Sequence, residues 1–159
     1  MTQQKGVTLV ELMITVSIVA IILAFVGPSI QGILIKNRIV AEINETSSLI
    51  QYARHHAIDE QAQVVVCPSK DYSVCSSDWN EPKIVFIDDD DNAIRGTTEE
   101  LLVTIGATSS TSLMTNSTNV IKFSGTGEAN LATEILLCHK DGKAEYARSL
   151  SVSLQGRVK

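Results

Sequence analysis

The fold is decided by residues 5–35, whose sequence is KGVTLVELMITVSIVAIILAFVGPSIQGILI. The last 24 of these residues, 12–35, carry no charge, and their densest apolar part is LMITVSIVAIILAFV over residues 12–26. A run of about 20 apolar residues is long enough to cross a bilayer as an α-helix. The stretch therefore predicts a membrane-embedded helix, which Gly27-Pro28 interrupts.

Glu11 stands at the start of this apolar run, where a charge is costly. An ionised side chain at membrane depth indicates a function by default, because it is unstable there without a partner. If the chain were cut after Gly6, Val7 would carry a free α-ammonium group four residues before Glu11, on the same helix face. An ordinary cleaved signal peptide is the alternative, but the run is long, no Ala-x-Ala-like site ends it, and the helical pattern continues into charged sequence.

Length and composition set limits on the remaining sequence. The chain has 159 residues and 17.2 kDa, which is enough for one domain, or for one domain plus an anchor. With 44% apolar and 19% charged residues it can bury a core, so wholesale disorder is excluded. The net charge of −5 excludes a generic basic nucleic-acid coat, and three cysteines exclude a disulfide-dense mini-scaffold.

Charge is nevertheless unevenly distributed along the chain. Residues 59–100 contain eleven acids and three bases, a balance of −8, whereas residues 136–159 contain five bases and two acids, a balance of +3. An acidic chain can therefore present a basic C-terminal surface.

Beyond the apolar run, the pattern first stays helical and then changes to strands. Residues 36–62 are predicted to form an amphipathic stem helix, whose apolar stripe is Ile39, Ile43, Ile50, Ala53 and Ala57. Residues 63–159 are predicted to form a β-rich head, in which residues 106–118 (GATSSTSLMTNST) read as a mobile loop. Short turns favour antiparallel pairing, so the fold class is α+β. The predicted strands are 63–67, 83–87, 101–105, 119–123, 135–139 and 145–154.

The segment Lys5–Glu11 resembles the type III signal of type IV pilins and type II secretion pseudopilins. The match includes the short basic leader MTQQKG (residues 1–6), the Glu at the fifth position after the cut and Pro28 at the twenty-second. In that family a prepilin peptidase cuts after the glycine, here Gly6, and methylates the new N-terminus. The usual first residue is Phe, and here it is Val7.

This resemblance implies a mechanism of assembly. The helix of residues 7–35 waits in the bacterial inner membrane, in contact with its lipid, with the head in the periplasm. An inner-membrane assembly platform then extracts it into a filament core. There Glu11 pairs with the N-terminal ammonium of a neighbouring subunit in a dry environment, where an unpaired charge would be costly. Pro28 loosens the helix, because proline removes a backbone donor and crowds the preceding turn.

Motifs in the head resemble those of the GspH/FimT/FimU group of minor pilins and minor pseudopilins. The resemblance covers essentially the whole chain and implies the pilin fold, a long N-terminal helix packed on an antiparallel β-sheet head. It implies a structural subunit and no enzyme, with other minor and major pilins as partners. The motifs are Cys67-Pro68-Ser69, Cys75, Asp78-Trp79, residues 83–88, residues 123–127 (FSGTG), Leu137-Cys138 and Gly156-Arg157.

The cysteines are predicted to form one disulfide, because a head outside the inner membrane lies in an oxidising compartment. Cys67 and Cys75 enclose seven residues and are the favoured pair. A bond from Cys138 to one of them is the alternative.

Other polar groups carry weaker signals. Residues 88–92 (DDDDN) imitate a calcium-binding loop but lack its glycine and distal Glu, so a solvated turn is predicted. His55-His56 has no nearby Cys or third His and is a weak metal signal. The sequence contains no phosphate-binding loop and no plausible Ser/His/Asp set. We therefore predict no enzyme, no metal and no cofactor.

The C-terminal Gly156-Arg157-Val158-Lys159 resembles the Gly-Arg-x-Arg motif with which FimT-type minor pilins bind DNA. Alternation places Arg157 and Lys159 on one side of an extended tail, where both could contact phosphates of double-stranded DNA. The alternative is a strand end that follows the family pattern for packing, because lysine lacks the bidentate fork of arginine and the acidic region repels DNA. Further bases of the predicted patch are Lys140, Lys143 and Arg148.

The sequence thus predicts a minor pilin that primes or caps a type IV pilus and so supports twitching motility and DNA uptake. From the inner membrane the subunit would pass to the pilus on the cell surface. The alternative is the minor, H-type pseudopilin of a type II secretion system, which shares the same assembly logic.

Overall fold

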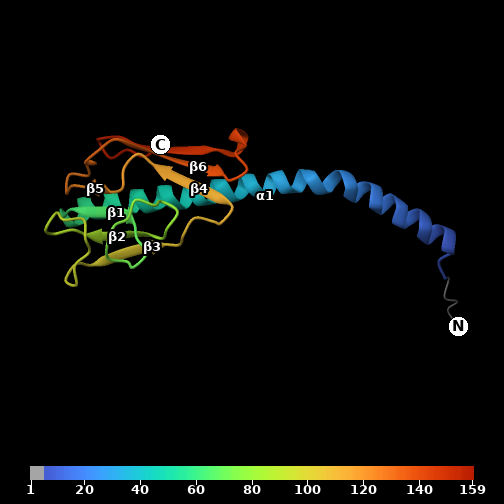
Figure 1. Cartoon of the computed structure of the whole chain (residues 1–159), viewed down its shortest axis with the longest axis horizontal. Helices are drawn as coiled ribbons and strands as arrows, with labels where there is room; N and C mark the ends of the chain where they lie inside the picture. The colour runs from blue at the N-terminus through green and yellow to red at the C-terminus, as the bar shows by residue number, and fades with distance from the viewer. Residues whose placement is uncertain (1–5) are drawn as a thin grey trace. The chain divides into compact units, whose positions relative to one another are not determined.

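The computed structural model describes residues 6–159, apart from the side chains of residues 25–29. The chain divides into two compact units between Asn37 and Arg38. One long helix, α1 (Leu9–Glu60), supplies most of the first unit and the first element of the second (Figure 1). The predicted helical pattern is confirmed over Leu9–Glu60, but the predicted interruption at Gly27-Pro28 is wrong, because the helix runs through Pro28 without a break. The predicted leader lies outside the described residues except for Gly6.

The first unit exposes its apolar side chains. Between Val7 and Leu23 each large aliphatic side chain is at least half exposed in the isolated chain. Among the described residues, which leave out side chains 25–29, no helix is long and apolar enough to cross a membrane.

In the second unit, residues 38–60 of α1 form one wall of the head. The predicted apolar stripe is confirmed, since Ile39, Ile43, Ile50, Ala53 and Ala57 are all buried. Leu49 and Thr46 are buried with them, and the Thr46 hydroxyl donates to the carbonyl of Glu42, so its polarity is satisfied within the helix. This spacing lets small and branched side chains pack closely against a sheet.

Seven strands form two antiparallel sheets, which confirms the α+β class. A short 3-10 helix, η1 (Ala144–Tyr146), precedes the last strand. The first sheet has the order β3-β2-β1-β5, with β1 (Val64–Pro68), β2 (Lys83–Ile87), β3 (Leu101–Ile105) and β5 (Ile121–Phe123). The second has the order β4-β6-β7, with β4 (Ser112–Asn116), β6 (Thr133–His139) and β7 (Arg148–Val152).

The predicted mobile loop over residues 106–118 is wrong in its second half. Residues 112–116 form β4, which pairs with β6 in a register that places Met114 opposite Leu137. The side chains of Ser112 and Met114 are buried, whereas the apolar side chain of Leu113 is exposed. The alternation of apolar and polar residues in the sequence therefore does not reveal which face of β4 is buried. Pairing with β6, whose partner residues lie 19 to 27 positions further along the chain, holds this polar segment as a strand.

Strand β1 is the centre of the head, because all five of its residues are buried. Val66 lies opposite Val85 of β2, which lies opposite Val103 of β3, and this face is covered by α1. On the other face Val65 and Cys67 pack with Ile84 and Phe86, beneath the loops that connect the strands.

Lys83, the first residue of β2, is almost fully buried between the sheet and α1. Its ammonium group donates a hydrogen bond of 2.8 Å to the hydroxyl of Thr108. Burial lowers the pKa of Lys83 to about 8, although Glu42, Glu45 and Asp78 attract its charge and oppose the change. The folded protein therefore binds this proton less tightly than the unfolded chain does.

Stability is expected to rise with pH because of Lys83. Below its folded pKa of about 8 the amine is charged in both states, so the full cost of burying the charge is present, and this cost disappears as pH approaches the ordinary value of 10.5. From pH 7 to pH 10, urea unfolding should show wild-type protein gaining about 2–3 kcal/mol relative to Lys83→Met. A difference between the two proteins that does not change with pH would contradict this expectation.

Candidate functional site

The start of α1 places Glu11 in a helix cap. Thr8 precedes the first helical residue, and its hydroxyl accepts a hydrogen bond of 3.3 Å from the backbone N–H of Glu11. A threonine followed three residues later by a glutamate is the pattern of a capping box, and a carboxylate is favourable at a helix N-terminus. The hydrogen bond is made by the backbone of Glu11, so the cap depends on Thr8, and the Glu11 carboxylate adds a favourable charge at the helix N-terminus.

The helix cap does not neutralise the charge of the Glu11 carboxylate. The four ion pairs found among the described residues all lie in the head. Val7 and Glu11 are both exposed in the isolated chain, at the edge of an apolar surface. This arrangement offers a carboxylate to a cation of another molecule once the apolar surface is covered.

The C-terminal residues are not a free tail, because residues 157–159 pair with β7 through an isolated bridge; this short segment, outside the seven strands, is called the C-terminal strand below. Val158 bridges to Val152, and the backbone groups of Ser151 and Lys159 exchange hydrogen bonds of 2.8 and 2.9 Å. Residues 157–159 therefore extend the second sheet beyond β7. Arg157 and Lys159 are both exposed, as predicted for alternate positions.

The position of Gly156 requires a glycine for a structural reason. Its φ is +71°, and a Cβ built on it would lie 2.1 Å from the carbonyl oxygen of Gly127. Arg54 of α1 donates to that same oxygen at 3.0 Å and to the carbonyl of Gln155 at 3.2 Å. The glycine of the C-terminal motif is thus required for packing, whatever the arginine and lysine after it do.

A basic pocket lies between α1 and the C-terminal strand. It has a volume of about 250 Å³, and its charged lining residues are Arg54, Arg157 and Lys159, with His55 beside them and no acid. The sequence did not indicate that Arg54 and His55 lie beside the C-terminal bases, because they are about 100 residues from the C-terminus. Lys140, Lys143 and Arg148 do not line this pocket, and Arg148 donates to the carbonyl of Ala147. The structure therefore brings together two of the five predicted bases.

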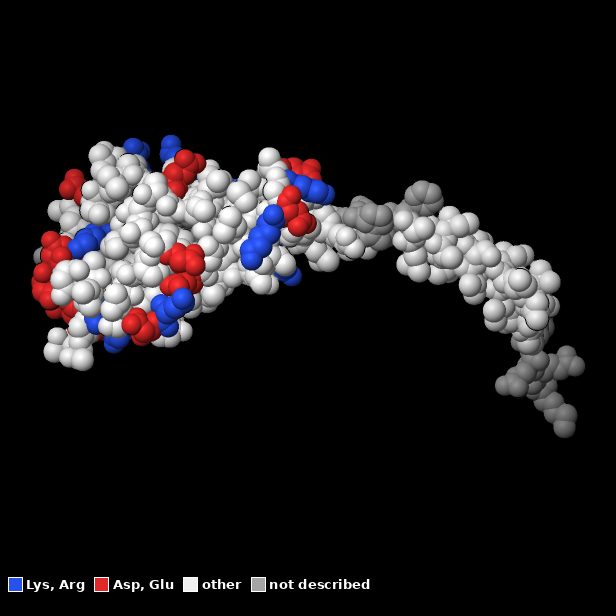
Figure 2. All heavy atoms as spheres, in the orientation of Figure 1, with Lys and Arg blue, Asp and Glu red and all other residues white. Residues whose placement is uncertain are grey.

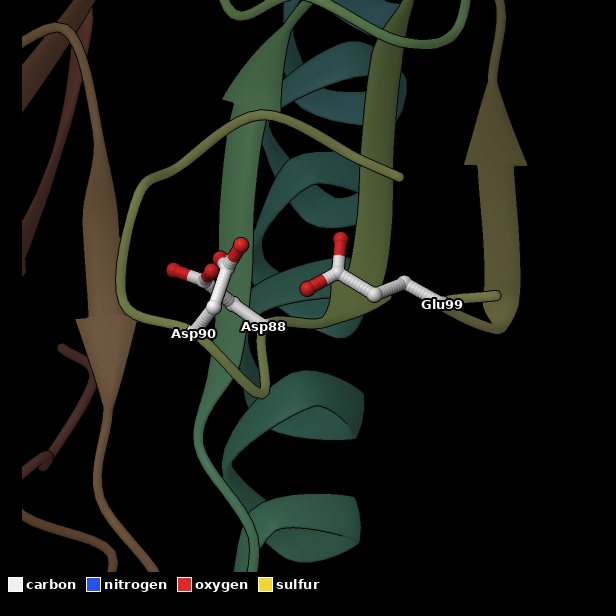
Figure 3. Close-up of side chains that lie close together, drawn as sticks. All are labelled: Asp88, Asp90 and Glu99. Atoms are coloured by element: carbon white, nitrogen blue, oxygen red, sulfur yellow. The ribbon is translucent and has the colours of Figure 1, made fainter. Parts of the chain in front are cut away.

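Acidic side chains gather over the end of the head where β2 ends (Figure 2). Asp88, Asp90 and Glu99 have carboxylate oxygens within 4.8 Å of one another and are the described residues that could hold a cation (Figure 3). The predicted solvated turn is wrong for Asp88, which is 2% exposed, whereas Asp89 and Asp90 are exposed. Three such ligands are fewer than the six to eight that calcium takes.

The buried carboxylates of this cluster already have partners in the chain. Asp88 accepts from the backbone N–H groups of Asn92 and Ala93 and from the Lys122 ammonium at 3.2 Å. Lys122 also pairs with Asp91, and this hydrogen bond lowers the pKa of Asp91. These contacts fasten the 88–93 loop to β5, which accounts for the acids without a bound metal.

The structure joins Cys67 and Cys75 in a disulfide, the pairing that we favoured, and leaves Cys138 as a half-buried thiol. The bond ties the loop after β1 to a strand that is buried on both faces. The backbone N–H of Ser76 also donates to the carbonyl of Pro68 at 2.8 Å, which closes the same loop.

Removing this disulfide should cost stability. For a loop of this length we expect Cys67→Ala/Cys75→Ala to lose about 2–3 kcal/mol in urea unfolding under oxidising conditions. Under reducing conditions the two proteins should differ by much less, which serves as the internal control. An equal difference under both conditions would show that lost packing, and not the cross-link, causes the effect.

Comparisons with known proteins agree with this architecture. The family model described as type II transport protein GspH matches residues 42–156, and the prokaryotic N-terminal methylation motif matches residues 1–27. The type IV minor pilin FimU of Pseudomonas aeruginosa is similar in structure, with a TM-score of 0.64 and 19% identity over 77% of this chain and 87% of that one. The minor pseudopilin EpsH of the Vibrio cholerae type 2 secretion system has a TM-score of 0.55 and 7% identity over 75% and 92%. No curated protein matches the sequence.

Proposed function

Because this chain belongs to the GspH family of minor pilins and pseudopilins, we propose that it is a minor subunit of a type IV pilus. In this role it primes or caps the filament in few copies, together with other minor and major pilins. It acts as a structural subunit and not as an enzyme. Twitching motility and DNA uptake depend on it through the filament.

The observation that carries this proposal is the exposed apolar N-terminal half of α1, with Glu11 in its first turn. Its large aliphatic side chains need a cover, because exposed apolar area of this extent is unfavourable in water. Inner-membrane lipid covers them before assembly, and neighbouring subunits cover them afterwards. Cleavage after Gly6 and N-methylation at Val7 by a prepilin peptidase provide the ammonium that Glu11 pairs with.

Fractionation of cells that produce this protein tests the proposal. Filaments sheared from the cell surface should contain the chain, cut after Gly6 and in a small ratio to the major subunit. The control is a Gly6→Leu variant, which should stay uncut and be absent from the sheared fraction. A processed chain that remains wholly in the membrane and periplasm would instead favour the H-type pseudopilin of type II secretion.

Direct DNA binding is a second candidate function, favoured by the basic pocket. Arg157 and Lys159 meet Arg54 and His55 there without an acid in the lining, so phosphates would encounter a locally positive surface in an acidic protein. Phosphate contacts of this kind give affinity that weakens as salt is raised.

A salt series separates this function from the structural one. With the full chain in detergent, binding of double-stranded DNA should weaken with salt, and Arg157→Ala/Lys159→Ala should reduce it at least tenfold. Lys140→Ala/Lys143→Ala removes the same charge outside the pocket and is expected to change binding little. Equal losses in both double variants would point to non-specific attraction, and no binding at low salt would leave only the assembly role.

A further inference from the structure

Three of the four sheet edges in the head are covered by the chain itself. At β4, the side chain of Asn80 accepts from the backbone N–H of Met114 at 2.8 Å and donates to its carbonyl at 3.2 Å. At β5, the side-chain oxygen of Asn130 accepts from the backbone N–H of Lys122, and the backbone N–H of Asn130 donates to the Lys122 carbonyl, both at 2.9 Å. At β7, residues 157–159 add a short strand.

The fourth edge, β3, is open. It is an outer strand of the first sheet and pairs with β2 on one side (Figure 1). On its other side no strand of the described residues pairs with it. Its sequence, LLVTI, contains no charge, proline or glycine, and its four aliphatic side chains are half-buried. An uncovered apolar edge strand is a template for a strand of another chain, and proteins usually block such edges. The contrast with the other three edges makes β3 a candidate docking site.

A groove runs beside this edge, between β3 and α1. It has a volume of about 350 Å³ and is lined by Leu49, Tyr52, Val103 and Ile105, with Glu45 and Ser48 at its margin. Side chains of an added strand point alternately to the two faces of the sheet. Every second side chain of such a strand would therefore enter the groove, while its backbone pairs with β3.

The charges around the edge restrict the partner further. Glu45 lies at the groove and Glu100 directly precedes β3, and both are exposed. Neither takes part in the ion pairs found among the described residues. An added strand flanked by lysine or arginine would complement them.

We infer that β3 accepts an extended segment of a different, neighbouring filament subunit, apolar at alternate positions and flanked by basic residues. This inference rests on the proposed function. A second copy of this chain is disfavoured, because subunits that keep their helices parallel in a filament are not related by the two-fold axis that antiparallel β3–β3 pairing needs. A subunit present in few copies also has mainly other subunits as neighbours.

Site-specific photocross-linking in filament-producing cells tests the inference on the full chain. The photoreactive residue p-benzoylphenylalanine is placed at Thr104 on the open edge or at Thr115 on the covered edge of β4; both threonines are exposed. From Thr104 we expect a cross-link to an extended segment of another subunit, with at least ten times the yield obtained from Thr115. A Val103→Glu change in the groove should lower the Thr104 yield at least tenfold, and Thr115→Glu should leave it unchanged.

The outcomes separate this inference from the proposed function. If the chain is present in sheared filaments but Thr104 gives no cross-link, or gives one only to a second copy, the docking role of β3 is wrong and the filament role stands. An unchanged yield in Val103→Glu also overturns the inference. If the chain is absent from filaments altogether, both are wrong.

Discussion

Replacing Glu11 by valine is expected to lower the amount of this chain in filaments about 100-fold while leaving the amount in the membrane unchanged. The reason is that the new N-terminal ammonium of a neighbour would be buried without its carboxylate, and breaking a buried ion pair costs about 3 kcal/mol or more. The measurement is the ratio of processed chain in sheared filaments to processed chain in membranes.

A glutamine at position 11 separates the charge from the helix cap. The capping bond uses the backbone N–H of residue 11, and Gln is also a capping-box residue, so Glu11→Gln keeps the cap and removes only the charge. We expect it to assemble as poorly as Glu11→Val, whereas Thr8→Ala, which removes the cap and keeps the charge, should assemble well. Normal assembly of Glu11→Gln would show that assembly does not need the charge of Glu11.

Gly156→Ala is expected to destabilise the head by about 3 kcal/mol or more and to release the C-terminal strand. The added Cβ would meet the carbonyl of Gly127 at 2.1 Å, in a backbone conformation with φ of +71° that alanine already disfavours. Urea unfolding measures the loss, and hydrogen exchange at Lys159 reports whether the strand leaves β7.

Gly142→Ala is a matched control, because Gly142 has the same φ of +71° and no atom within 4 Å of the built Cβ. It should show the cost of the backbone conformation alone, about 1–2 kcal/mol. Equal losses in the two variants would mean that the contact with Gly127 does not matter. The Gly156→Ala change also displaces Arg157 and Lys159. A loss of DNA binding in this variant would therefore reflect the altered fold of the C-terminal strand.

The helix and most strands could be predicted from the sequence because their signals are local. The stripe from Ile39 to Ala57 repeats at helical spacing, and runs such as residues 83–87 (KIVFI) consist of strand-forming residues. Strand β4 could not be predicted, because its buried face carries a serine and its partner β6 lies far along the chain. The division into two sheets could not be predicted from the sequence either, since it depends on the pairing of β1 with β5, more than 50 residues away.

The candidate sites were predictable only in part. The motif around Glu11 is continuous in sequence, so its residues could be named, whereas the cap from Thr8 became visible only in the structure. The C-terminal bases were named without Arg54 and His55, which join them through tertiary packing. The burial of Lys83 and Asp88 was unpredictable for the same reason, because their partners come from other elements.

The attachment of Arg54 has a mechanical consequence. A pulling force on the N-terminal half of α1 reaches the head through residues 38–60 of the same helix, which form the wall against which the sheets pack. Near the far end of that helix, Arg54 binds the carbonyls of Gly127 and Gln155, and Arg38 binds the hydroxyl of Thr111 near the point where the helix enters the head. Sliding the helix out must break contacts at both ends and along the buried stripe together. Such a head should resist tension through a slow rate of forced unfolding, a property separate from its equilibrium stability.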